Sequence, residues 1–116
     1  MTEEKKQKMF RSNCEIAIHV PDLEIARSFY ADVLGFQLVH EHLTGLVFET
    51  GALKLYVNLD STAIYSYIPS FDVPDYAQAR IYLENWGCRT IPLLPPLEGV
   101  YFQDPFGLIF DIVERA

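Results

Sequence analysis

Hydrophobic and polar residues alternate over several short stretches of this chain, and each such stretch predicts a β-strand. From Cys14 to Val20 every second residue faces one way, so Glu15, Ala17 and His19 should lie together on the opposite side. Asp104-Pro105-Phe106-Gly107 suits a type I turn between two later strands. Beyond Cys14–Val20, strands are expected at Phe36–His42, Leu46–Thr50, Leu53–Leu59, Ile68–Val73, Arg89–Ile91, Val100–Gln103 and Leu108–Glu114.

Two stretches instead place apolar residues at helical spacing. Asp22 and Asp75 are suited to be the N-caps of these helices, and Gly35 and Gly87 are placed to end them. The predicted apolar stripes are Leu23, Ala26, Phe29, Tyr30, Val33 and Leu34 in the first helix, and Tyr76, Ala79, Tyr82, Leu83 and Trp86 in the second.

The first half of the chain is repeated in the second. Val20-Pro21-Asp22 recurs as Val73-Pro74-Asp75, and each copy reads strand, helix, three strands. A repeat of this length indicates two supersecondary modules rather than a solenoid of short repeats. We expect a charged, flexible segment over residues 1–12 and one domain over 13–116, with modules at about 13–60 and 66–116.

The charge and composition limit the classes of partner. The chain has 116 residues and a formal net charge of −7, which argues against nucleic acid or an anionic membrane as partner. No apolar run is long enough to span a bilayer or to act as a secretory signal, so a cytoplasmic location is expected. The cysteines Cys14 and Cys88 lack metal-type spacing and are expected to be reduced and buried.

The chain resembles the vicinal oxygen chelate superfamily of glyoxalases, bleomycin resistance proteins and extradiol dioxygenases. The resemblance covers most of the chain and rests on Val20-Pro21-Asp22-Leu23-Glu24, Phe29-Tyr30, Leu34-Gly35-Phe36 and Asp104-Pro105-Phe106-Gly107. It implies an α+β fold in which two tandem βαβββ modules form a curved mixed sheet around a cleft, and it implies a homodimer. It does not imply one activity, because the superfamily includes several classes of enzyme and metal-free binding proteins.

Enzymes of the superfamily place metal ligands at four positions on the cleft, which the resemblance carries over to Glu15, Tyr56, Ile68 and Asp111. None of the four is a histidine, and Ile68 cannot bind a metal. We therefore expect no cofactor, no tightly bound transition metal and at most a weakly held divalent ion on Glu15 and Asp111. His40 and His42 share a strand face away from these positions and are expected at the surface or an edge.

These residues give a leading function and an alternative. Glu15 and Asp111 are the predicted catalytic or cation-binding carboxylates. The predicted ligand-binding residues are Lys54, Tyr56, Ile68, Tyr101 and Phe102. The leading function is small-molecule binding without the full metal-ligand set, as in a drug-binding or resistance-type protein. The alternative is a glyoxalase-like, metal-dependent lyase or isomerase that uses Glu15 and Asp111, and a third class is a structural or regulatory subunit that uses the cleft only for dimerisation.

Overall fold

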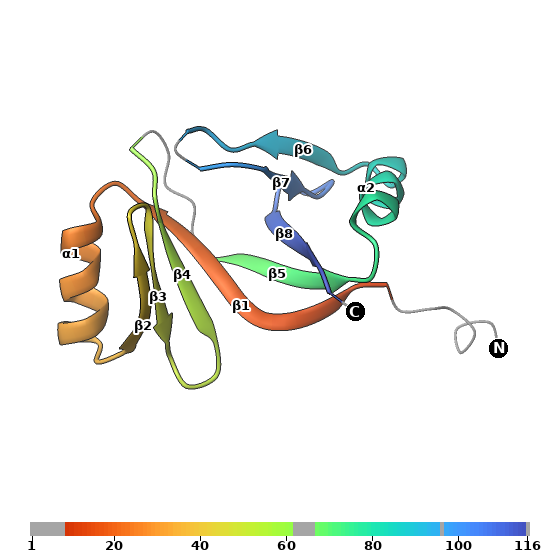
Figure 1. Ribbon diagram of the computed structural model, residues 1–116. Helices are drawn as coiled ribbons and strands as arrows, with labels where there is room; N and C mark the ends of the chain where they lie inside the picture. Colours follow the sequence, from red (N-terminus) through yellow and green to blue (C-terminus); the bar gives the residue numbers. More distant parts are fainter. Residues whose placement is uncertain (1–8, 62–66, 96, 116) are drawn as a thin grey trace.

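The computed structural model describes residues 9–61, 67–95 and 97–115, and it forms a curved eight-stranded sheet with two helical segments (Figure 1). This is the predicted mixed α+β fold. The first half of the chain contains β1 (Arg11–Val20), α1 (Leu23–Arg27), the π-helix η2 (Ser28–Val33), β2 (Gln37–His42), β3 (Gly45–Glu49) and β4 (Lys54–Leu59). The second half contains β5 (Ile68–Val73), α2 (Tyr76–Asn85), β6 (Arg89–Pro92), β7 (Val100–Gln103) and β8 (Ile109–Glu114).

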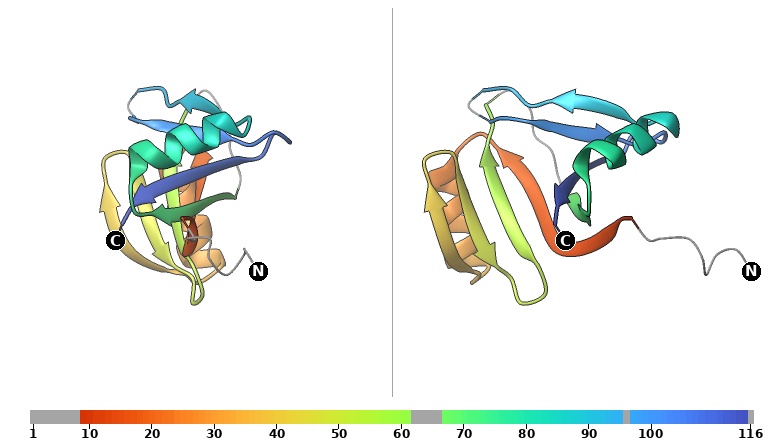
Figure 2. Two further views of the ribbon diagram at one scale, coloured as in Figure 1. Left: turned by 90° about the vertical axis from the view of Figure 1, so that its right-hand side faces the viewer. Right: turned by 45° about the vertical axis from the view of Figure 1, so that its right-hand side comes forward.

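The strands lie in the order β2-β3-β4-β1-β5-β8-β7-β6. Within each half the first strand pairs with the last in parallel (β1 with β4, β5 with β8), and β1 and β5 join the halves as an antiparallel pair. Figures 1 and 2 show the long, bent β1 running across the molecule between the two halves. The predicted strands at Ile68–Val73 and Val100–Gln103 are confirmed to the residue, and turn-forming residues flank them: Pro74-Asp75 after the first, and Gly99 and Asp104-Pro105 on either side of the second.

The predicted helix caps are confirmed. Asp22 accepts a hydrogen bond from the Ile25 backbone N–H at 3.0 Å, and Asp75 accepts one from Gln78 at 3.0 Å. Gly35 has φ +77°, the left-handed conformation expected after the first helix. The predicted turn at 104–107 also forms, with the Gly107 N–H donating to the Asp104 carbonyl at 3.0 Å.

The apolar stripe predicted for the first helix is only partly correct. Ala26 is buried and Tyr30 packs against the core, but Phe29 and Val33 remain 46% and 69% exposed. The helix changes to π geometry at Ser28, and the Leu34 N–H bonds to the Phe29 carbonyl five residues back. This wider turn rotates the following side chains away from the 3.6-residue period on which the prediction depends.

The second helix departs from its predicted stripe in the same way, although it remains α-helical. Ala79 is buried, whereas Tyr82 and Trp86 are 47% and 70% exposed. Its packed residues are Tyr76, Ala79 and Leu83, a narrower stripe than expected.

One core cluster lies under each helix. The first includes Ile18, Phe48 and Val57, and the second includes Val73 and Phe102. Because side chains alternate along a strand, the residues between these core positions point to the face of the sheet away from the helices. That face is therefore the one available for a site.

The prediction that both cysteines are buried is wrong: Cys14 is exposed and Cys88 is only half-buried, although both are free thiols. Cys14 has φ +59°, and the pairing of β1 with β5 shifts register between Ser12 and Ile16. This β-bulge interrupts the alternation, so Cys14 does not share the buried face of Ile16 and Ile18.

Two predicted segments fall largely outside the described residues. These are most of the charged N-terminal segment and most of the linker between the halves, although Arg11 and Ser12 belong to β1. Within residues 9–61, 67–95 and 97–115, no helix has the length and apolar character needed to cross a membrane.

Candidate functional site

The face of the sheet away from the helices contains a cavity of about 250 Å³. Tyr56, Ala17 and Ile68 lie side by side on β4, β1 and β5, and Asp111 of β8 lies beside Ser70 of β5. The cavity therefore spans the junction between the two halves. Its lining consists of Glu15, Ile16, Ala17, Tyr56, Asn58, Ile68, Ser70, Tyr101, Asp111, Val113 and Arg115.

Five of the seven predicted site residues meet in this cavity: Glu15, Tyr56, Ile68, Tyr101 and Asp111. They come from five strands in both halves. The four positions carried over from the superfamily's metal ligands thus share one small space.

The other two predicted ligand-binding residues lie elsewhere. Phe102 is fully buried in the second core cluster, where it stacks on Phe110. It follows Tyr101 on β7 and so points to the opposite face. Lys54 is the Cα partner of Glu15 but is exposed at the start of β4 and does not line the cavity.

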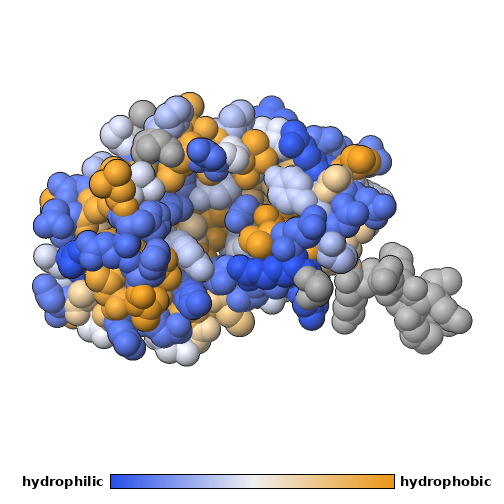
Figure 3. All heavy atoms as spheres, in the orientation of Figure 1, coloured by the Kyte–Doolittle hydropathy of each residue, from blue (hydrophilic) through white to orange (hydrophobic). Residues whose placement is uncertain are grey.

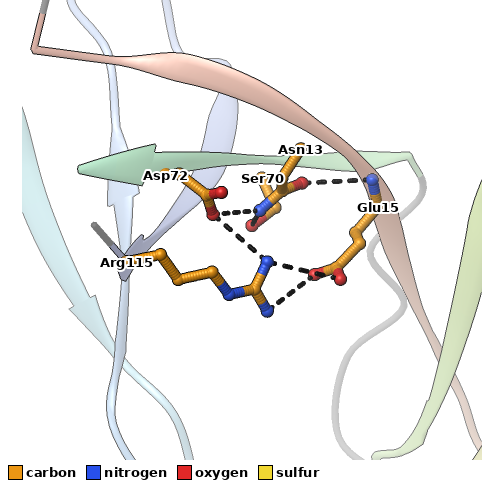
Figure 4. Close-up of polar contacts among 5 residues, drawn as sticks. All are labelled: Asn13, Glu15, Ser70, Asp72 and Arg115. Carbon is orange, nitrogen blue, oxygen red and sulfur yellow. Dashed lines mark hydrogen bonds and ion pairs between the residues drawn. The ribbon is translucent and has the colours of Figure 1, made fainter. Parts of the chain in front are cut away.

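Arg115, rather than Lys54, is the cation beside Glu15. Its Nη1 and Nη2 atoms lie 3.5 Å from the two Glu15 carboxylate oxygens, and Nη1 lies 3.2 Å from Asp72 Oδ1 (Figure 4). The alternation that turns Asp111 and Val113 toward the cavity continues to Arg115, and this is the signal that could have identified it.

The electrostatics of the cavity distinguish its two carboxyl groups. Burial raises the pKa of Asp111 to about 6; the neighbouring Glu15 carboxylate adds to this, and a hydrogen bond with the Ile112 backbone opposes it. Burial, and then the charge of Glu15, also raise the pKa of Tyr56. Asp111 is therefore a group that can take up or release a proton near neutral pH.

Replacing Asp111 by asparagine should stabilise the protein in a pH-dependent way. The raised pKa means that ionised Asp111 costs stability, a cost that is absent below about pH 4, develops up to about pH 6 and is complete above it. We expect the gain in unfolding free energy for Asp111→Asn to be about 2 kcal/mol larger at pH 7.5 than at pH 4.5. Urea denaturation of both proteins at the two pH values measures this, and an equal gain at both would contradict the assignment.

A buried polar chain lies at the end of the same sheet face. His19 is fully buried; its Nδ1 lies 3.0 Å from Asp60 Oδ2, and its Nε2 lies 2.8 Å from the Tyr101 hydroxyl oxygen. Because a carboxylate only accepts, Nδ1–H donates to Asp60, and Nε2 forms the hydrogen bond with the Tyr101 hydroxyl. These hydrogen bonds link β1 to β7 and hold the Tyr101 side chain in its place in the cavity wall. Sequence reasoning missed it, because the partners lie 41 and 82 residues from His19.

Two larger cavities, of about 370 and 450 Å³, have different linings. The first lies beside η2, among residues such as Leu34, Phe36 and Leu53. The second lies near the turn at 104–107, beside Pro69 and Phe110. Neither of these two cavities is lined by side chains of both charges, as the 250 Å³ cavity is. The 250 Å³ cavity is therefore the better candidate for specific binding.

The side chains of the candidate site do not fit a transition metal. Nitrogen and sulfur donors are missing from the four carried-over positions, and the Glu15 carboxylate is already paired with Arg115. In the part of the chain that the structure describes, no three His, Cys, Asp or Glu side chains come together in a metal-binding arrangement.

Comparison with known proteins defines the family. The family model of the Glyoxalase/Bleomycin resistance protein/Dioxygenase superfamily matches residues 15–112. The chain belongs to this superfamily. A comparison with curated protein sequences gave no match.

Several solved structures share the fold of this chain. Homoprotocatechuate 2,3-dioxygenase from Brevibacterium fuscum matches with TM-score 0.66 and 21% identity, over 94% of this chain and 33% of the dioxygenase chain. Methylmalonyl-CoA epimerase from Mycobacterium tuberculosis matches with TM-score 0.62 and 19% identity, over 96% and 92% of the two chains. A hypothetical protein from Bacillus halodurans C-125 matches with TM-score 0.66 and 14% identity, over 94% and 96%. The TM-scores show that the fold is shared. Because the sequence identities are low, the activity has to be inferred from the residues of the site.

Proposed function

We propose that this superfamily member binds a small organic molecule in the cavity between Glu15 and Asp111. The observation that carries the proposal is the convergence of five strands on a cavity with charged groups, two tyrosines and apolar wall residues. Ligand sites typically combine an apolar lining with a few convergent polar groups in this way, at volumes of about 300–1,000 Å³. A cavity of about 250 Å³ suits a ligand of modest size.

Charge defines the ligand class. Glu15 and Asp72 are paired with one guanidinium, that of Arg115, and Asp111 lines the same cavity as Glu15, so the site has an excess of negative charge above the pKa of Asp111. A neutral or cationic amphipathic ligand is favoured, with its apolar part against Ile68 and its polar part toward Asp111. Sequestration of a drug in a cytoplasmic protein is one form of this role.

The raised pKa of Asp111 supports a second candidate, an isomerase or lyase that moves a proton. A carboxyl group with a pKa of about 6 can act as base or acid near neutral pH. Likeness to an epimerase agrees with this candidate. Because the donor set does not fit a transition metal, the proton transfer would depend on Asp111 and on Tyr56, which lines the same cavity.

Ligand-dependent thermal shift tests the binding proposal. Small amphipathic cations, neutral aromatic compounds and aromatic carboxylates are added to the wild type, to Asp111→Asn and to Lys54→Ala as the control outside the cavity. We expect cations or neutral compounds to raise the melting temperature of the wild type and of Lys54→Ala, and to do so less for Asp111→Asn. Shifts that are the same in all three proteins would contradict binding at this cavity.

We also propose a homodimer. The strands β2 and β6 form the two ends of the sheet, and the stripe Ile25, Phe29 and Val33 on α1 and η2 is exposed. Figure 3 shows hydrophobic residues reaching the surface among hydrophilic ones at the α1 end of the molecule. A second chain would cover such surface.

Sedimentation equilibrium should therefore give a dimer at micromolar concentration. Phe29→Glu should shift the equilibrium toward monomer if the stripe lies in the interface, whereas Phe106→Glu, at an exposed turn, should not. A wild-type protein that is monomeric across ordinary salt concentrations would contradict the dimer.

A further inference from the structure

The 370 Å³ cavity beside η2, called the η2 cavity below, lies between the sheet and the helical layer of the first half of the chain. Ile18 of β1 and Leu55 of the neighbouring strand β4 line it from the sheet, and Tyr30 and Leu34 line it from the helical side. The other lining residues are Ile16, His19, Val20, Phe36, Thr50, Leu53 and Tyr67. Most of this wall is aliphatic or aromatic, and none of its described lining residues is an Asp, Glu, Lys or Arg.

The π geometry of η2 shapes the helical side of the η2 cavity. The Leu34 N–H donates to the Phe29 carbonyl at 2.9 Å, and the Phe36 N–H donates to the Tyr30 carbonyl at 2.9 Å. The Tyr30 and Phe36 rings, which both line the cavity, are stacked with centroids 6.4 Å apart. Segments of π-helix are rare and are frequently found at functional sites. The widened turn therefore places two aromatic rings in the cavity wall.

Tyr67 forms another part of this wall and has a strained backbone. Its φ is +54°, in the left-handed region that is unfavourable for a residue with a bulky side chain. Strained residues of this kind are concentrated at sites that hold ligands. Burial, and then the charge of Tyr67, raise the pKa of the Tyr30 hydroxyl, so the two phenols lie near each other. A mainly apolar wall thus carries two neighbouring hydroxyl groups.

We propose that the η2 cavity is a second binding site, and that it takes an uncharged molecule consisting mainly of hydrocarbon. Apolar cavities bind apolar molecules readily, because water gains few hydrogen bonds inside them. A volume of 370 Å³ lies within the range typical of ligand sites. A single hydroxyl or carbonyl group of the ligand can bond to Tyr30 or Tyr67.

The absence of charge among the described lining residues separates this site from the 250 Å³ cavity. A cation that entered the η2 cavity would lose its hydration without gaining an ionic partner, so cations are disfavoured there. The proposal does not depend on the function proposed for the 250 Å³ cavity, which is lined by carboxylates.

Two probes with the same ring test the proposal. Cyclohexanol is uncharged, whereas cyclohexylamine is a cation at neutral pH. Each is titrated into the wild type, into Leu34→Trp, which fills part of the cavity, and into Ile81→Trp. Ile81 is exposed on α2, outside the cavity, and provides the matched control. Amide shifts in ¹H–¹⁵N NMR spectra locate the binding, and circular dichroism confirms the fold.

We expect cyclohexanol to give saturable shifts at Leu34, Phe36, Leu53 and Tyr67, and cyclohexylamine to give none there. Leu34→Trp should weaken cyclohexanol binding at least about tenfold, and Ile81→Trp should resemble the wild type. Cyclohexanol shifts that do not saturate, that fall on the lining of the 250 Å³ cavity instead, or that survive in folded Leu34→Trp would overturn the proposal. Equal shifts with cyclohexylamine would also overturn it.

The wild-type titrations decide the proposal even if Leu34→Trp does not fold. Spectra of the wild type without a probe are also recorded at two protein concentrations. Shifts at Leu34, Phe36 and Leu53 that depend on protein concentration would show that a second copy of the chain covers the cavity, which would overturn the proposal. Because binding is located residue by residue, a failure here is distinct from a failure at the 250 Å³ cavity.

Discussion

Replacing Phe102 by alanine should lower the free energy of unfolding by about 3–5 kcal/mol. Phe102 is fully buried, stacks on Phe110 with ring centroids 5.8 Å apart, and lies 6.2 Å from the Tyr76 ring of α2. Truncation removes buried apolar surface and leaves a cavity between α2 and the sheet, where close packing limits collapse. Urea denaturation followed by circular dichroism measures the loss.

Phe106→Ala is the matched control, because Phe106 is the same residue type four positions along and is 90% exposed. Its unfolding free energy should stay within about 0.5 kcal/mol of the wild type. A small loss for Phe102→Ala would mean that Phe102 is not the centre of the second core, and would return it to the ligand-binding role that the sequence suggested.

Replacing His19 by alanine should cost about 2–4 kcal/mol. His19 is fully buried and bonds to both Asp60 and Tyr101, so truncation removes a partner from two polar groups and opens a void between the halves. The same urea denaturation at pH 7 measures the loss.

His40→Ala provides the control for the histidine ring itself. His40 is exposed on β2, an edge strand, and the structure agrees with the predicted surface position. The expected change is within about 0.5 kcal/mol. If His19→Ala lowers the free energy of unfolding no more than His40→Ala does, the buried hydrogen bonds of His19 with Asp60 and Tyr101 contribute little to holding the two halves together.

The strands and caps could be predicted because each depends on a local signal. Turn-forming residues such as Pro74-Asp75, Gly99 and Asp104-Pro105 mark ends of β5 and β7, and an aspartate before an apolar stripe marks each helix start. The stripe of the first helix was wrong because η2 has π geometry, which the local sequence pattern did not indicate. The stripe of the second helix was wrong although α2 is a regular α-helix, because only Tyr76, Ala79 and Leu83 pack against the sheet. The irregularity at Cys14 is a second departure from a regular pattern: from Ser12 to Ile16 β1 advances four positions while its partner β5 advances two, so the alternation is interrupted there.

The residues of the candidate site also differ in whether a local signal could predict them. Glu15, Tyr56 and Asp111 could be placed on one face by alternation, and the structure brings them into one cavity. Their partners could not be placed, because pairing across strands depends on tertiary distance. Arg115 reaches Glu15 from 100 residues away, although Lys54 is the Cα neighbour of Glu15 in the sheet.

The most direct test of the proposed ligand site is to map where a ligand binds. Amide shifts in ¹H–¹⁵N NMR spectra are recorded with the compound that gives the largest thermal shift in the wild type. The account predicts that the largest perturbations fall on Ala17, Tyr56, Ile68 and Asp111, which line the cavity at the junction of the halves. Perturbations concentrated instead on Leu34, Phe36 and Leu53, beside η2, would contradict it.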